Sequence, residues 1–523
     1  MNVNKNKKLY SFLIWLCVYA GIFCFCFLAH PQVILDYDDW SYVSYFRVPV
    51  PWPSFWNPSR VLPECLMPLC GFLGALVYRL IPSLGYIKAE SLFFALVLSA
   101  FEMLYLYMFS RLMAKRFQTG ISGTVISSAV FFLFHFLIFR TNAENNPYLF
   151  RTANLTCMFF YLIPALLNAA LVMYFMADPS SFEYFFSSPD HAAEKKALLK
   201  KLIVLIVVYF CIFSNLFASI IAAVFAFFEI LKGALYLNKN GGLLRNFRGF
   251  LRRYSLGFVI LLLFLVSVLF EAFGGRAAVS YGDQIPLAEG LRSALSFTAV
   301  TAGSVSRAAV CSALAILALF ASVCVSGKSI SAGSARSSDA DIFSFVLVSV
   351  LSAIIIGIYI ILLSAKVWAE YVERPDILIS FFFPLFLAVS AALGRVISKV
   401  PKAAYPSAAL AVLMALLVNT PGRTFAESYS LDCEVSPETC MALSQDLVDQ
   451  VLTAEREGKD KVTVEVMFTG NYGSDNWPQV TYLGDVLVST LRKHGVISGD
   501  ITVDIFPSDS FNEKYGLVFD PYE

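Results

Sequence analysis

A cluster of acidic residues near the N-terminus is the part of the sequence best suited to chemistry. Asp36, Asp38 and Asp39 directly follow the first long apolar stretch, and Arg60 follows after a segment rich in proline and aromatic residues. A carboxylate can act as a general base toward an attacking hydroxyl, and an arginine can bind a phosphate through paired hydrogen bonds. At a membrane surface, such a pair suits a substrate whose phosphate is attached to a lipid. The alternative is that these aspartates are solvated residues of a polar juxtamembrane loop.

The same segment contains tryptophans that could contact either a membrane or a sugar. Trp40, Trp52 and Trp56 lie among its prolines and tyrosines. Tryptophan is enriched at the membrane–water interface, and its flat amphipathic ring can also stack on the face of a sugar. The sequence leaves both roles open. We take Trp40 and Trp56 as candidate substrate contacts.

The composition indicates a membrane protein. Of the 523 residues, 58% are hydrophobic and 15% are charged, whereas soluble domains have about 45–50% apolar and about 25% charged residues. Apolar runs of about the 20 residues needed to cross a bilayer recur along the chain. The predicted spans cover residues 10–29, 91–110, 121–139, 153–176, 202–214, 217–238, 254–273, 308–327, 342–364, 377–394 and 403–420.

A further apolar segment, residues 61–81, decides the topology. If this segment does not cross the membrane, every strongly basic loop lies in the cytoplasm, as the positive-inside rule requires. If the segment crosses, all of these basic loops lie outside. These basic clusters lie at 111–116, 195–201, 232–253 and 395–402. We therefore predict that 61–81 is an interfacial or re-entrant helix on the outer side. About eleven crossings then place the N-terminus in the cytoplasm and the C-terminus outside.

The C-terminal tail differs in composition from the rest of the chain. It reads as a capped amphipathic helix ("SPETCMALSQDLVDQVLTAEREG"), a strand ("KVTVEVMFTG"), a second helix ("VTYLGDVLVSTLRKHG") and a second strand ("DITVDIF"). We predict a transmembrane domain over 1–420, with a first outer loop at 30–90, and an extracytoplasmic α/β domain over 421–523. Cys433 and Cys440 could form a disulfide in an oxidising compartment.

Three polar residues elsewhere are further candidates for substrate contact. Arg151 begins a predicted span and Arg374 precedes another, so both could contact a phosphate. Asn215 lies where the apolar run 202–238 is too long for one span and is expected to turn near Ser214. Each has a plainer alternative: a solvated loop for Arg151, an interfacial role for Arg374 and a helix–helix hydrogen bond for Asn215.

Several short motifs resemble those of a family of membrane glycosyltransferases. The stretch "DDW" followed by "WNPSR" and an apolar helix is similar to a pattern in bacterial relatives of the O-antigen glucosyltransferases. "RTANLTCMFFYLIPALL", "FSNLFASI" and "FNEKYGL" also resemble segments of these proteins. The overall layout, with one span, an acidic outer loop, an in-plane helix and many further spans, resembles the GT-C superfamily. Pro58 and Ser59 precede Arg60 where a glycine is usual in the family.

The resemblance implies an inverting hexosyltransferase that uses a polyprenyl-phosphate-linked sugar as donor. It implies a catalytic base at Asp38 or Asp39, without deciding between them, and it leaves any metal requirement open; no cofactor is predicted. The expected partners are the donor, a surface glycan or lipid acceptor and the bilayer, with no nucleic acid. The expected location is the plasma membrane of a bacterial cell. The alternatives are a transporter or flippase, or a polymerase or ligase, of lipid-linked saccharides.

Overall fold

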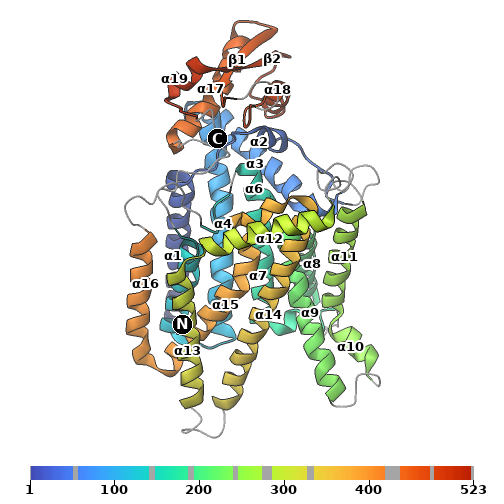
Figure 1. Ribbon diagram of the computed structural model, residues 1–523, viewed down its shortest axis with the longest axis vertical. Helices are drawn as coiled ribbons and strands as arrows, with labels where there is room; N and C mark the ends of the chain where they lie inside the picture. The colour runs from blue at the N-terminus through green and yellow to red at the C-terminus, as the bar shows by residue number, and fades with distance from the viewer. Residues whose placement is uncertain are drawn as a thin grey trace.

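The structure is a computed structural model in which most of the chain is α-helical (Figure 1). It describes residues 2–50, 57–140, 148–152, 154–186, 194–239, 246–273, 286–326, 335–418, 436–470 and 476–519. The long helices are α1 (Asn2–Cys24), α3 (Val61–Leu80), α4 (Tyr86–Lys115), α5 (Gly120–Leu137), α7 (Ile163–Ala177), α8 (Glu194–Ile212), α9 (Leu216–Lys239), α11 (Ser255–Phe273), α12 (Leu287–Ser304), α13 (Arg307–Ser326), α14 (Ala335–Val367), α15 (Pro375–Lys399) and α16 (Ala404–Val418). Short helices are α2 (Tyr37–Tyr42), α6 (Leu155–Cys157) and α10 (Phe247–Arg253).

Eleven helices in the described part of the chain are long and apolar enough to cross a membrane, so the chain is a polytopic helical membrane protein. They include the helix over 58–80, and they do not include α8, which begins in a lysine-rich stretch. The helices α7 and α15 are strongly apolar and almost completely buried at the centre of the bundle, as expected for helices surrounded by other helices. The predicted turn between residues 202 and 238 is confirmed, because α8 ends at Ile212 and α9 begins at Leu216.

The C-terminal segment contains the helices and strands that the sequence predicted. They are α17 (Pro437–Arg456), β1 (Lys461–Met467), α18 (Leu483–Lys493) and β2 (Thr502–Ser508), followed by α19 (Asp509–Tyr515). The hydroxyl of Ser436 caps α17 by accepting a hydrogen bond from the Thr439 amide at 3.1 Å. The strands β1 and β2 pair in parallel, and parallel strands need a crossover connection, which here contains α18. Cys433 lies outside the described residues.

This α/β segment sits on one end of the bundle, which we call the α/β end (Figure 1). Thr490 of α18 donates a hydrogen bond to the carbonyl oxygen of Trp40 at 2.9 Å and its hydroxyl lies 2.8 Å from that of Ser44. The side chain of Gln445 in α17 accepts a hydrogen bond from the Ile87 amide at the start of α4. The end of α1, which leads into α2, and the start of α4 therefore lie at the same end of the bundle.

The path of α3 follows from these contacts. At its start, the Leu62 amide donates to the carbonyl oxygen of Phe213 in the turn between α8 and α9. Near its end, the Arg79 guanidinium lies against Gly495, just after α18. Because α3 begins and ends at the α/β end, it does not pass through the bundle. The prediction that 61–81 is an interfacial or re-entrant helix on the outer side stays a prediction, because by length and composition this helix also qualifies as a span.

One long helix has no counterpart among the predicted spans. Helix α12 runs across the bundle rather than along it (Figure 1), and it packs against α14 and the 3₁₀ turn Ala369–Glu373. Its sequence contains Glu289, Arg292 and several small polar residues, which lower its apolar character below that of a span. The predicted outer loop 274–307 is thus partly a packed helix.

Candidate functional site

Helix α2 carries the acidic cluster, and Asp36 forms its N-cap. The Oδ1 atom of Asp36 accepts a hydrogen bond from the Asp39 amide at 2.8 Å, which is the usual way an aspartate begins a helix. Its Oδ2 atom accepts from the side-chain amide of Asn154 at 2.6 Å. Asp36 is fully buried, and this burial, together with the nearby Asp39, raises its pKa well above the ordinary value. Asp36 therefore shapes the helix and joins it to the start of α6.

Asp39 is also fully buried and accepts three hydrogen bonds. Its Oδ1 atom accepts from the amide and hydroxyl of Thr156 at 2.7 and 2.8 Å, and its Oδ2 atom accepts from the Leu35 amide at 3.1 Å. Burial raises the pKa of Asp39 to about 6, although the hydrogen bonds from Leu35 and Thr156 act in the opposite direction. These contacts hold the carboxylate in place and keep it from solvent.

Asp38 differs from its neighbours because it is half-buried. It is four residues before Tyr42, which is also half-buried, and side chains four residues apart lie on the same face of a helix. The buried residues Asp39 and Trp40 occupy the other face. Of the two aspartates predicted as catalytic, Asp38 is thus the one on the accessible face of α2.

The hydroxyl of Tyr42 connects this face to Arg60. It accepts a hydrogen bond from Arg60 Nη1 at 2.9 Å, and the guanidinium lies over the ring of Phe160, 5.5 Å from its centre. Arg60 also lies 3.4 Å from a carboxylate oxygen of Glu64, and Arg47 pairs with the other oxygen of Glu64. Two guanidinium groups therefore share one buried carboxylate, which leaves this group of three with an excess positive charge.

Arg60 lines a cleft at the α/β end of the bundle. The cleft contains about 380 Å³ of empty space, including the part open to solvent, and is lined by Ser59, Arg60, Phe160, Tyr161, Asn215, Leu216, Phe217, Glu271, Leu363 and Val367. Within it, the hydroxyl of Ser59 donates to Glu271 Oε2 at 2.6 Å. The side-chain oxygen of Asn215 accepts from the Phe217 amide at 2.8 Å, so Asn215 caps the start of α9 as well as lining the cleft.

Arg374 is near this cleft, but it is already paired. It forms two hydrogen bonds with Asp376, at 2.6 and 3.2 Å, and lies over the ring of Tyr161, 4.3 Å from its centre. Since Tyr161 lines the cleft, residues 160 and 161 bring the two predicted arginines to one place. A phosphate would have to compete with Asp376 for Arg374.

Of the other predicted site residues, Trp40 and Arg151 do not line the cleft. Trp40 is fully buried and stacks on Tyr86, with ring centres 6.3 Å apart, and it is not among the residues that line the cleft. Trp56 lies outside the described residues. Arg151 is half-buried in the stretch that leads to Asn154 and α6, and therefore lies at the same end as α2.

Sequence reasoning missed several residues of the site. Tyr42 could have been found from its spacing to Asp38, because the two form an i, i+4 pair on a short capped helix. Glu64 could likewise have been found from its spacing to Arg60. Glu271 and Tyr161 gave no local signal, since they reach the cleft only through the packing of distant helices.

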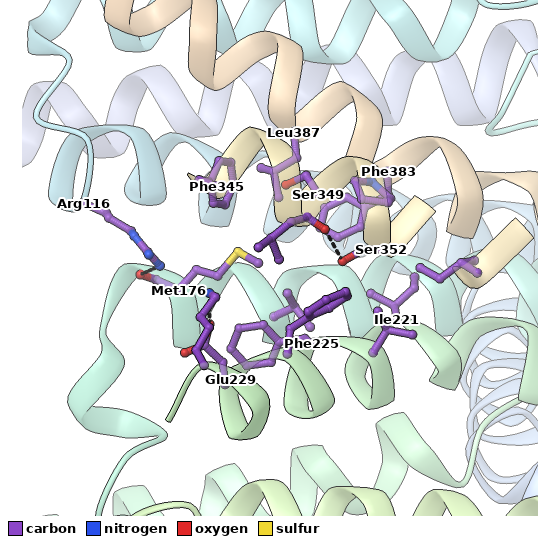
Figure 2. Close-up of a pocket in the computed structure, with 17 residues that line it drawn as sticks. Arg116, Met176, Ile221, Phe225, Glu229, Phe345, Ser349, Ser352, Phe383 and Leu387 are labelled. Carbon is purple, nitrogen blue, oxygen red and sulfur yellow. Dashed lines mark hydrogen bonds and ion pairs between the residues drawn. The ribbon is translucent and has the colours of Figure 1, made fainter. Parts of the chain in front are cut away.

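A second cavity lies farther from the α/β end, between α7, α9, α14 and α15 (Figure 2). It contains about 520 Å³ of empty space and its walls are mainly aliphatic and aromatic, with Val224, Phe225, Ile356, Phe383 and Leu387 among them. Figure 2 shows Arg116 and Glu229 at one side of this cavity.

Comparisons with known proteins identify no relative. No protein-family model, no curated protein and no solved structure matches the chain. Among the described residues, no group of three or more His, Cys, Asp or Glu side chains is placed to bind a metal ion. The fold and the site thus define the chain as a polytopic helical membrane protein with a carboxylate, an arginine and a cleft at one end of its bundle.

Proposed function

We propose that the chain is a membrane glycosyltransferase that moves a sugar from a polyprenyl-phosphate carrier to a hydroxyl of a surface glycan or lipid. In this proposal the α/β end faces the exterior of a bacterial cell, which places the basic clusters in the cytoplasm. The observation that carries the proposal is the geometry of α2. Its accessible face presents Asp38 one helical turn from Tyr42, whose hydroxyl is bonded to Arg60 beside the cleft.

The proposed reaction needs one base and one group that stabilises the leaving phosphate. The acceptor hydroxyl attacks the anomeric carbon and transfers its proton to the carboxylate of Asp38. The bond between that carbon and the phosphate oxygen breaks, and the lipid phosphate leaves with the electron pair. Arg60 stabilises the charge that develops on this oxygen. A single displacement of this kind inverts the anomeric centre.

The buried residues of α2 support this reaction by holding Asp38 in position. Asp36 and Asp39 join α2 to the start of α6 through Asn154 and Thr156. A positioned base is effective because the reacting atoms must lie within hydrogen-bond reach. Asp39 accepts three hydrogen bonds and is buried, so we assign it a positioning role.

Arg60 can exchange its present partner for a phosphate. Its contact with Glu64 is long, at 3.4 Å, and Glu64 keeps a second partner in Arg47. A phosphate that enters the cleft would therefore replace a weak contact without leaving the Glu64 carboxylate unpaired. The cost of an unpaired buried charge is avoided.

The test is mass spectrometry of surface glycans from cells that express the wild type or single variants at equal levels. We expect Asp38→Asn and Arg60→Ala to remove one sugar-sized mass from the glycan. Asp485→Asn, an exposed residue on α18, is the matched control and should keep it. Unchanged glycans in Asp38→Asn, Arg60→Ala and a complete deletion would refute the transferase.

A second candidate function is transport of a lipid-linked saccharide, and Glu102 favours it. This residue is almost completely buried in α4, and an ionisable residue within a membrane span is often part of a transport pathway. Movement of a fluorescent polyprenyl-phosphate sugar across reconstituted vesicles separates the two functions. Transport that Glu102→Gln abolishes and Asp38→Asn leaves intact would establish the second candidate. A polymerase or ligase would use the same cleft with a larger donor.

A further inference from the structure

The two cavities lie along the same pair of helices. The cleft beside Arg60 is lined by Phe217 of α9 and Leu363 of α14, and the second cavity begins at Ile221 of α9 and Ile356 of α14. These helices pack against each other. At a rise of about 1.5 Å per residue, the two cavities are separated by only about 6 Å along α9 and about 10 Å along α14.

The seam between the cavities is mainly apolar, and its two buried hydroxyls are those of Ser219 on α9 and Tyr359 on α14. Ile220 on α9 and Ile360 on α14 lie in this interval, and both are buried. The two serines of the second cavity do not change its character. Ser352 donates its hydroxyl to the carbonyl oxygen of Val348 at 2.7 Å, and Ser349 is the only other uncharged polar side chain among the residues that line it. A space of this kind suits a hydrocarbon chain better than water.

The charged residues of the second cavity, Arg116, Glu229 and Lys232, all have partners within the protein. Lys232 is paired with Glu229 at 2.7 Å, and the Arg116 guanidinium donates to the carbonyl oxygen of Met176 at 3.1 Å. At the cleft, Arg60 keeps only a long contact of 3.4 Å with Glu64, whose carboxylate is also paired with Arg47. Under the proposed function the lipid phosphate contacts Arg60, and its chain is directed along the seam.

We propose that the seam between α9 and α14 binds the hydrocarbon chain of the carrier lipid and that the second cavity selects for a long chain. This rests on the proposed function, because the phosphate of the same lipid occupies the cleft at Arg60. A short chain would end near the cleft. A long isoprenoid chain would continue past Ile220 and Ile360 and fill the second cavity. The binding free energy gained by a long chain comes from packing contacts in an otherwise empty space. The hydrophobic effect adds little, because the chain leaves lipid that is already apolar.

The test compares two isoprenoid phosphates of different chain length. Undecaprenyl phosphate and geranylgeranyl phosphate are titrated against the full-length protein in detergent, and binding is measured by native mass spectrometry. We expect the wild type to bind the long chain at least about fivefold more tightly. Ser352→Phe, which fills the second cavity (Figure 2), should remove this preference and leave the affinity for the short chain unchanged. Val224→Phe fills the same cavity from α9 and provides a second variant if Ser352→Phe does not fold.

The control is Leu351→Phe, which enlarges an exposed side chain of the same helix and should keep the preference. Equal binding of both chains by the wild type would overturn the proposal but leave the phosphate site intact. A preference that persists in both cavity-filling variants would also overturn the proposal. It would also be overturned if those variants kept the preference for the long chain but lost a phospholipid that co-purifies with the wild type. If neither lipid phosphate binds the wild type, the proposed function fails together with the chain site.

Discussion

The different surroundings of Asp38 and Asp39 predict opposite effects of the same substitution. In Asp39→Asn, the amide oxygen can keep the two hydrogen bonds from Thr156, but the NH₂ group then faces the Leu35 amide, which is itself a donor. Loss of one hydrogen bond to a charged acceptor costs about 1.5–3 kcal/mol. Asp38→Asn alters a half-buried side chain, and such changes are usually within about 0.5 kcal/mol.

The assay combines thermal unfolding with sugar transfer. In a single detergent at neutral pH, we expect Asp39→Asn to lower the melting temperature by about 1–3 °C and Asp38→Asn to leave it unchanged. Transfer should fall by about 10²–10⁴-fold in Asp38→Asn, because the general base is lost. In Asp39→Asn any decrease should be smaller and follow from the displaced helix.

Two results would contradict this reasoning. If Asp39→Asn melts at the temperature of the wild type, the three hydrogen bonds to its carboxylate do not hold α2. If Asp38→Asn is fully active while Asp39→Asn is inactive at an unchanged melting temperature, the roles assigned to the two aspartates are reversed. Measurement of both variants together separates loss of chemistry from loss of structure.

Three further predictions concern the surroundings of α2. Because the pKa of Asp39 is raised to about 6, the folded protein holds the Asp39 proton more tightly than the unfolded chain does. The melting temperature should therefore fall as the pH rises through about 6. An equally steep fall in Asp39→Asn would exclude Asp39 as the cause. Thr490→Val should lower the free energy of unfolding by about 1–3 kcal/mol and increase amide hydrogen exchange in residues 37–44, because Thr490 bonds to Trp40 and Ser44. The control Thr453→Val, at an exposed position, should do neither. Equal exchange in both variants would refute the attachment of α2 to α18. Gly71→Ala should lower the free energy of unfolding by about 1–3 kcal/mol, because the added Cβ would collide with a backbone oxygen just after α2. Gly249→Ala, where the added Cβ meets open space, is the control. Equal melting temperatures of the two variants would contradict the close packing at Gly71.

The parts of the fold that sequence predicts well are those with a strong local pattern. Apolar periodicity located the long helices, and the capping pattern beginning at Ser436 located α17. For residues 61–81 the two kinds of pattern disagree, because the charge rule for loops predicts a helix that does not cross, whereas length and composition alone count it as a span. Helix α12 was missed because its small and charged residues match neither a span nor a typical loop.

The candidate site shows where local patterns stop being informative. The acidic pair and Arg60 stand out in the sequence, but nothing in it distinguishes a buried aspartate from an accessible one. That difference comes from Asn154 and Thr156, which reach α2 from more than 100 positions along the chain. The burial of Trp40 was likewise not evident from the sequence, since its ring stacks on Tyr86 at the start of α4.

The arrangement around α2 gives a physical reason for placing three aspartates at the edge of the bundle. A buried carboxylate is costly unless donors surround it, and the donors for Asp36 and Asp39 come from the start of α6 and from the backbone of α2 and the residues before it. Thr490 adds a third attachment from α18. A helix of six residues is too short to be stable alone, so these attachments determine where it lies. The third aspartate, Asp38, is thereby held on the accessible face of α2, one helical turn from Tyr42, whose hydroxyl is bonded to Arg60; under the proposed function, this is where the base acts.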